Sequence, residues 1–414
     1  MTEASGDLLS FLRPCRVRND KIDDGYIYLI KSLFIFDELL KMESIEQRDT
    51  KAPHHASNQF LQTRHQDFLQ HIAFDHYGRR LATCSGDRNV IVWQLGGDGE
   101  WTSPQEGSWK AHLSSVNSLS WAHPEFGQLL ATCGTDGFIK VWEERSDSSG
   151  GGFTATLDST ENGTTLGKNM NRDGTASRWT ARLSKNAGNK PLTCVKFAPG
   201  NIALKFATGC VNGIVYIYEA TNRMELTDWI LSDTIEFEKS ASFSEVGVTC
   251  LDWCPSRSEP PSLVIGGRSG NLEIYQCSTE SRKYTHFIKL DSRNMSPTLQ
   301  PMVQGILDVS WSPDVGRSFH LIASCGRDGE LKVYRLKKMP AKDKDGSDSL
   351  TRNNLQLESS QSLDTQGCTM WRCGWNVTGT VLASSGDGGN VLLHKSDWQN
   401  VWKLVSKVEQ GMGT

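Results

Sequence analysis

Two sets of side chains combine histidine, threonine and aspartate, the residue types of a hydrolytic triad. Each set is followed by a tryptophan, and the two sets recur at similar spacings: His65, Thr83, Asp87 and Trp93, then His112, Thr132, Asp136 and Trp142. An imidazole that is oriented by a carboxylate can activate a hydroxyl nucleophile. The same groups also satisfy one another when buried, because buried polar atoms need hydrogen-bond partners. Since the pattern recurs, we interpret both sets as structural networks that link the strands of a blade.

The chain shows no further motif for catalysis or for a resident cofactor. It contains 10 His and 11 Cys residues. Their spacing gives no HExxH or CxxC, and the sequence contains no GxSxG and no phosphate-binding loop. The glycines at 386–389 lack the Lys-Ser/Thr pair that such a loop needs. We therefore predict a non-enzymatic protein without a metal or a cofactor.

Six hairpins must position these residues. Each hairpin joins a strand of small residues to a β-branched strand, and the strands close on Trp93, Trp142, Tyr218, Tyr275, Tyr334 and His394. Another strand with an aromatic residue precedes each hairpin. A sheet of this kind cannot bury both of its faces alone, whereas radial stacking of several sheets buries them. The sequence therefore predicts an all-β fold, a six-bladed β-propeller.

We expect the propeller to occupy residues 59–409, between an N-terminal extension, 1–58, and a C-terminal tail, 410–414. Two polar stretches interrupt the repeat spacing and are predicted to be loop insertions: 144–190 and 336–366. The extension contains an apolar run at 26–40 and is predicted to be disordered or partly helical. Two interpretations of this extension remain open: it is an amphipathic helix that touches a partner, or it results from a wrongly assigned start of the coding sequence.

The ends of the repeat array leave ring closure undecided. Residues 101–110 offer an outer strand to the first blade, and residues 398–408 offer one to the last blade. The last blade thus completes itself without borrowing a strand from the other terminus. An exposed sheet edge is a docking site for strands of a partner. The residues alone therefore allow a closed ring and an open ring.

Charge and hydropathy exclude two classes of partner. The 44 basic and 48 acidic residues give a net charge of −4, which argues against direct nucleic-acid binding. Lys31, Asp37 and Glu38 interrupt the apolar run at 26–40, which is too short and too charged to span a bilayer. We expect neither nucleic-acid binding nor membrane insertion.

Longer stretches resemble one branch of the WD-repeat proteins, from Phe60 to the C-terminus. They include "HYGRRLATCSGDRNVIVW", "WAHPEFGQLLATCGTDG", "GIVYIYEA", "GRSFHLIAS" and "WNVTGTVLASSGDGG". These stretches resemble the SEH-one-type nucleoporins, which are relatives of the SEC-thirteen coat proteins. The resemblance implies an open propeller, completed by a blade from an α-solenoid nucleoporin of the Y-shaped nuclear pore subcomplex. That role would place the protein at the nuclear envelope, in the nuclear pore complex.

The resemblance also implies a second assembly, a GATOR-type amino-acid-signalling complex with a Mio-type subunit, at a cytoplasmic or lysosomal surface. The alternative function is that of a SEC-thirteen-like subunit of a COPII vesicle coat. Matching the first strand of the first and last blades to the family gives four candidates for docking of the partner's blade: Ile72, Phe74, Trp371 and Trp375. Ordinary packing between blades is the competing interpretation for each of them.

Overall fold

The computed structural model describes most of the predicted propeller. The described residues are 61, 63–97, 99–104, 107–144, 179–200, 202–222, 226, 228–237, 247–278, 280–292, 305–342, 348–387 and 389–408. The predicted extension 1–58 and tail 410–414 lie outside them, so those predictions are not tested. Within these ranges, no helix is long and apolar enough to cross a membrane.

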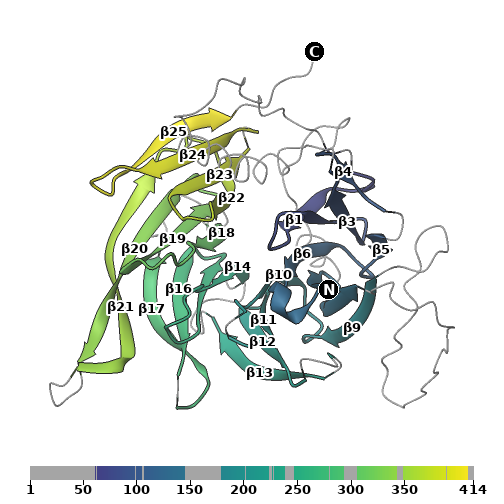
Figure 1. Cartoon of the computed structure of the whole chain (residues 1–414), viewed down its shortest axis with the longest axis horizontal. Coiled ribbons are helices and arrows are strands. Elements are labelled where there is room, and N and C mark those ends of the chain that lie inside the picture. Colours follow the sequence, from purple (N-terminus) through teal and green to yellow (C-terminus); the bar gives the residue numbers. More distant parts are fainter. Residues whose placement is uncertain are drawn as a thin grey trace, which may run out of the picture. The chain divides into compact units, whose positions relative to one another are not determined.

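Six sheets, which we call blades one to six, follow one another along the chain (Figure 1). Blade one contains β1 (Leu69–Phe74), β2 (Arg80–Ser85), β3 (Asn89–Leu95), β4 (Trp101–Thr102) and β5 (Ser108–Lys110). Blade two contains β6 (Val116–Trp121), β7 (Leu129–Gly134), β8 (Phe138–Glu144) and β9 (Trp179–Asn186). Blade three contains β10 (Leu192–Phe197), β11 (Lys205–Cys210), β12 (Ile214–Ala220) and β13 (Trp229–Glu236).

The remaining blades repeat this plan. Blade four contains β14 (Val248–Trp253), β15 (Ser262–Gly267), β16 (Asn271–Cys277) and β17 (Tyr284–Ser292). Blade five contains β18 (Ile306–Trp311), β19 (Phe319–Gly326), β20 (Leu331–Lys342) and β21 (Asp348–Leu363). Blade six contains β22 (Met370–Trp375), β23 (Val381–Gly386), β24 (Val391–Ser396) and β25 (Trp402–Val408). The all-β, six-bladed propeller predicted from the repeats is confirmed, whereas the openness of the ring stays a prediction.

The chain divides into two compact units, which we describe separately. One unit comprises His65–Trp253 and Cys277–Thr285, and it includes blades one to three. The other comprises Met1–Arg64, Cys254–Gln276 and His286–Thr414, and it includes blades five and six.

Apolar side chains of neighbouring blades form the core inside each unit. Between blades one and two, the ring of Trp109 stacks on Trp179 with centroids 5.3 Å apart and meets Trp142 edge-on at 5.5 Å. These three indoles are among the largest fully buried side chains of the described residues. Their burial accounts for the aromatic residues that the repeat places at the ends of its strands.

The prediction of a loop at 336–366 is wrong, because most of this stretch is the long hairpin of β20 and β21. Leu336, Leu355 and Leu363 are buried in this hairpin, while many of its other residues are polar. Strands with one solvated face are polar on average and therefore resemble loops in composition. At the end of the other predicted loop, residues 179–186 form β9, the outer strand of blade two, while residues 145–178 lie outside the described residues.

Candidate functional site

The structure brings the four side chains of the first predicted network together in blade one. The Nδ1 atom of His65 lies 3.1 Å from Asp87 Oδ2, and its Nε2 atom lies 3.0 Å from Thr83 Oγ1. The indole N–H of Trp93 donates to the same Thr83 oxygen over 3.1 Å. Asp87 is in the turn between β2 and β3, and His65 precedes β1. The network therefore joins the segment before β1, the turn and the next two strands.

The second network repeats this geometry in blade two. His112 Nδ1 lies 3.1 Å from Asp136 Oδ1, and His112 Nε2 lies 2.9 Å from Thr132 Oγ1. The indole N–H of Trp142 donates to Thr132 Oγ1 over 2.9 Å. Burial lowers the pKa of His112 below its ordinary value, although the Asp136 carboxylate opposes this change. A neutral ring that donates from Nδ1 to Asp136 can accept the Thr132 hydroxyl at Nε2.

This geometry does not suit a threonine nucleophile. Thr83 and Thr132 are both fully buried, and each hydroxyl already contacts an imidazole and an indole. A nucleophile must reach the carbon atom that it attacks, which a closed network inside a sheet prevents. The arrangement instead supplies partners for polar atoms that the packing of strands removes from water.

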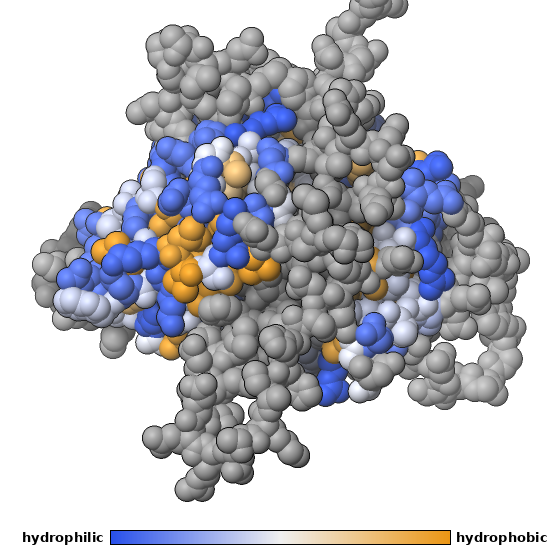
Figure 2. Space-filling model, turned by 90° about the horizontal axis from the view of Figure 1, so that it is seen from above, coloured by the Kyte–Doolittle hydropathy of each residue, from blue (hydrophilic) through white to orange (hydrophobic). Residues whose placement is uncertain are grey.

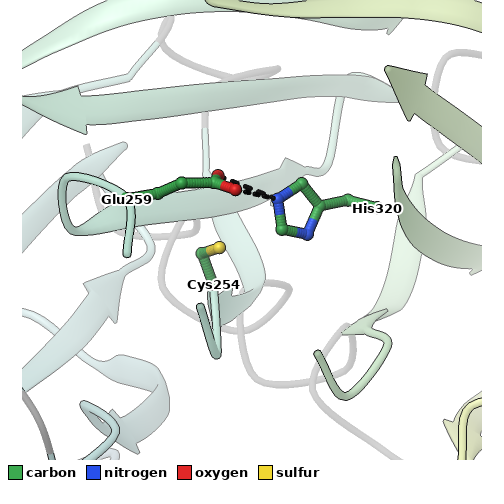
Figure 3. Close-up of side chains that lie close together, drawn as sticks. All are labelled: Cys254, Glu259 and His320. Carbon is green, nitrogen blue, oxygen red and sulfur yellow. Dashed lines mark hydrogen bonds and ion pairs between the residues drawn. The ribbon is translucent and has the colours of Figure 1, made fainter. Parts of the chain in front are cut away.

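A third polar cluster, which the sequence analysis missed, connects blade five to the segment before β15 (Figure 3). Glu259 and His320 are buried, and His320 Nε2 lies 2.8 and 2.9 Å from the two carboxylate oxygens. Lys338 Nζ lies 2.9 Å from Glu259 Oε1. The indole N–H of Trp311 donates to His320 Nδ1 over 3.4 Å. The motif "GRSFH" contains His320, but its acidic partner is 61 residues away along the chain.

Cys254 completes a group whose residue types could bind zinc or form a thiol nucleophile. The possible ligand atoms of Cys254, Glu259 and His320 lie within 4.8 Å of one another. However, a metal would compete with Lys338 for the Glu259 carboxylate and with Trp311 for the His320 ring. Burial raises the pKa of Cys254 to about 12, which opposes the thiolate that both metal binding and nucleophilic attack require. We interpret the cluster as a structural ion-pair network.

Burial alone would raise the pKa of Glu259, but the hydrogen bond and charge of His320, together with Lys338, lower it below its ordinary value. Glu259 is therefore ionised at neutral pH. Removing one partner of such a buried pair leaves an unpaired charge inside the protein, which strongly lowers the free energy of unfolding. The cluster thus fixes the loop before β15 against β19 and β20.

The first strands of the blades show how neighbouring blades recognise each other. We number the six residues of each first strand from one to six. Trp121, Trp253 and Trp375 occupy position six, and each indole N–H donates to a backbone carbonyl of the preceding blade over 3.0 Å. The side chains at position four also face the preceding blade, because Leu119 and Val195 pack in apolar clusters with residues of that blade.

Positions two, three and five point toward the following blade. At position two, Asn117 and Thr193 donate to the backbone carbonyls of Leu192 and Val248 over 2.6 and 2.8 Å. At positions three and five, the Ser118 and Ser120 hydroxyls accept the N–H groups of β10. In blades two and three, positions two, three and five thus contact the following blade, whereas Arg372 at position three of β22 lies 3.5 Å from Asp308 of the preceding blade.

This positional rule sorts the four predicted docking residues. Ile72 and Phe74 occupy positions four and six of β1, on the side that faces away from blade two. Trp371 occupies position two of β22, on the side that faces away from blade five, and its N–H donates to Asp387. Trp375, by contrast, donates to Ser310 of blade five, and its ring lies 5.2 Å from Trp402. The ring and the N–H group of Trp375 are used inside the chain, which favours ordinary packing between blades at this position, and its docking role stays a prediction.

Comparisons with known proteins agree with this architecture. The family model described as "WD domain, G-beta repeat" matches residues 58–94 and 103–143. The solved structure of the Myceliophteria_thermophila Cps50 (Swd1) beta-propeller domain is similar in fold, with a TM-score of 0.50 and 15% identity over 82% of this chain and 85% of that chain. At this identity the likeness concerns the fold alone.

Curated relatives are more informative. Nucleoporin SEH1 of Danio rerio is 33% identical over 349 residues, which are 82% of this chain and 84% of that protein. Nucleoporin SEH1 of Homo sapiens is 33% identical over the same length, with coverage of 82% and 85%. Identity at this level along four fifths of the chain shows common descent, and the chain therefore belongs to the family of SEH1 nucleoporins.

Proposed function

We propose that the protein is a non-enzymatic scaffold subunit of the nuclear pore complex, whose propeller is completed by a sheet from a partner. The SEH1 relatives support the pore role and its location at the nuclear pore. The partner that the family resemblance favours is an α-solenoid nucleoporin of the Y-shaped subcomplex. The same end surfaces would serve a Mio-type subunit of a GATOR-type complex at a cytoplasmic or lysosomal surface.

One observation carries the proposal, the nature of the outward sides of β1 and β22. Across the six first strands, position two is occupied by Gln70, Asn117, Thr193, Thr249, Leu307 and Trp371. At this position, blades one to five have polar or aliphatic side chains, whereas blade six has the half-buried indole of Trp371. At the other end, the half-buried ring of Phe74 packs 5.6 Å from Trp101 of the same blade and lacks the N–H donor of Trp121, Trp253 and Trp375. Two apolar end sides suit a further sheet of apolar side chains.

The outer surface of blade six offers a competing location for the partner. Figure 2 shows hydrophobic residues surrounded by hydrophilic ones on the side of the molecule seen from above. The exposed large hydrophobic residues of blade six are Val377, Trp398, Val401 and Val405. Exposed apolar patches mark interaction sites when they are contiguous. An experiment must therefore distinguish the side of β22 from this surface.

The experiment compares Trp371→Asp with the matched control Trp398→Asp. Trp398 is 88% exposed in the same blade. The full chain is co-purified with the α-solenoid nucleoporin of its species, and the dissociation constant is measured by calorimetry. We expect Trp371→Asp to weaken binding at least 100-fold and Trp398→Asp to change it less than threefold. Thermal unfolding of each free variant verifies that it is folded.

The opposite order of effects would place the partner on the outer surface of blade six and overturn the docking proposal. Phe74→Asp tests the other end independently, and we expect a loss of similar size. In the alternative function, a SEC-thirteen-like COPII subunit, the tagged protein would gather at vesicle exit sites instead of the nuclear rim.

A further inference from the structure

A cavity of about 200 Å³ opens between blades five and six, apart from the first strands that carry the proposed blade completion. Its apolar lining comes from Phe319, Leu321, Val333 and Trp402. Leu321, Val333 and Trp402 are buried core residues, while Phe319 is half-buried. An apolar cavity of about 150 Å³ is large enough to hold benzene. This one therefore has room for a single leucine- or phenylalanine-sized side chain.

Two arginines frame this apolar lining. Arg335 lies over the Phe319 ring with its guanidinium carbon 3.7 Å from the centroid, and the Arg317 guanidinium carbon is 5.7 Å away. Stacking on a ring holds a guanidinium plane in place. The cavity lining contains these two cations and no carboxylate.

The charges of the two arginines are compensated to different degrees. Arg335 Nε lies 2.7 Å from the Glu358 carboxylate, which neutralises it in place. Arg317 donates instead to neutral oxygens, the carbonyls of Thr378 and Gly379 at 2.7 and 3.3 Å and the Ser312 hydroxyl at 3.5 Å. Burial lowers the pKa of Arg317 from its ordinary value, although the charge of Asp314 opposes this change, and a guanidinium stays protonated at neutral pH. The Asp314 carboxylate itself pairs with Lys338 at 3.5 Å, so it compensates Arg317 only in part. The mouth of the cavity therefore carries a positive charge, in a chain whose net charge is −4.

We propose that this cavity is a docking site for a peptide segment of a partner protein, which inserts one apolar side chain between blades five and six and places an adjacent carboxylate on Arg317. The apolar walls select an aromatic or branched aliphatic side chain, and the Arg317 guanidinium, which is only partly compensated, selects the acid. Arginine pairs well with carboxylates because its planar N–H edge matches their two oxygens. This site is separate from the β22 side that the proposed donated blade would use.

Selection of peptides tests the occupant directly. A display library of random 12-residue peptides is panned on the full chain and counter-selected on Thr380→Tyr, since Thr380 is exposed and lines the cavity. We expect enriched peptides to carry an aromatic or aliphatic residue within two positions of Asp or Glu. Enrichment of peptides without an acid, or no enrichment over the filled variant, would overturn the proposal.

Direct binding measurements then separate the two selecting features. The best peptide is compared with its own Asp→Asn or Glu→Gln analogue, which leaves the protein unchanged and avoids any effect on folding. We expect the analogue and Arg317→Gln each to weaken binding at least tenfold by fluorescence anisotropy. Lys337→Gln is the matched control, because Lys337 is an exposed cation of β20 outside the cavity lining, and we expect less than a twofold change. An equal loss of peptide binding in Arg317→Gln and Lys337→Gln would show that positive charge attracts the peptide without a specific site, and it would refute the proposal.

Discussion

The Asp87 carboxylate accepts hydrogen bonds from the His65 ring and from the backbone N–H groups of Gln66 and Asn89. Burial alone would raise the pKa of this group, but these donors lower it from 3.8 to about 2. The carboxylate is thus held in its charged form inside the blade. Asp136 repeats this pattern with His112, Leu113 and Phe138, and its pKa is lowered in the same way. Both groups link a histidine, the segment before the first strand of the blade and the start of its third strand.

Asp87→Asn is expected to reveal this stabilisation as a pH dependence. Because the folded pKa of Asp87 is lower than the unfolded value, the carboxylate stabilises the fold fully above pH 3.8 and loses this effect as the pH falls through about 2. The difference corresponds to roughly 2 kcal/mol in the free energy of unfolding at neutral pH. Urea unfolding of the wild type and the variant at pH 6 and at pH 2.5 measures it. A difference between the two proteins that is as large at pH 2.5 as at pH 6 would contradict the argument.

The turn that holds Asp87 shows how an element tolerates an unfavourable residue. The next residue, Arg88, has φ +74°, whereas Gly137 holds the equivalent position in blade two with φ +76°. Left-handed backbone costs most residues about 1–2 kcal/mol, and glycine avoids this cost. The backbone carbonyl of Arg88 accepts the N–H groups of Ala111 and His112, which helps to keep the turn in place.

Arg88→Gly should therefore stabilise the protein, and Gly137→Ala should destabilise it. We expect a gain of about 0.5–1 kcal/mol for the first change, because relief of backbone strain exceeds the extra entropy of unfolded glycine. At Gly137, an added Cβ would lie 3.1 Å from the Lys190 carbonyl oxygen as well as strain the backbone. Chemical denaturation measures both variants. A loss of stability in Arg88→Gly would show that the Arg88 side chain contributes more than its backbone costs.

The same elements show what the sequence could and could not predict. The hairpins and the His–Thr–Asp–Trp sets were predictable, because their members recur at fixed offsets from each turn. Glu259 was not, because its partner His320 belongs to another blade. The sequence could not show that the indole of Trp375 faces blade five, because the register shift between Met370 and Arg372 changes which residues of β22 share a side. No pattern in the six residues of the strand marks that bulge.

At the scale of the whole molecule, the proposed functions use two different kinds of surface. In the proposal, the sides of β1 and β22 that carry Ile72, Phe74 and Trp371 receive the partner's sheet, so blade completion would rest mainly on apolar contact. The cavity between blades five and six adds a partly compensated cation, Arg317, to an apolar lining. The first kind of interface suits a permanent assembly, and the second suits a peptide that binds and leaves.

Salt should separate these two surfaces in one protein. Exposed charges lose most of their attraction within a few ångströms at 1 M ionic strength, whereas apolar burial is preserved or strengthened. We therefore expect the complex with the blade-donating partner to stay 1:1, with a dissociation constant that changes less than threefold between 0.1 and 1 M NaCl. Over the same range, a peptide held by Arg317 should bind at least fivefold more weakly. Calorimetry on the full chain measures the first and fluorescence anisotropy the second. Dissociation of the partner by salt would mean that charge, and not a completed set of blades, holds the assembly together.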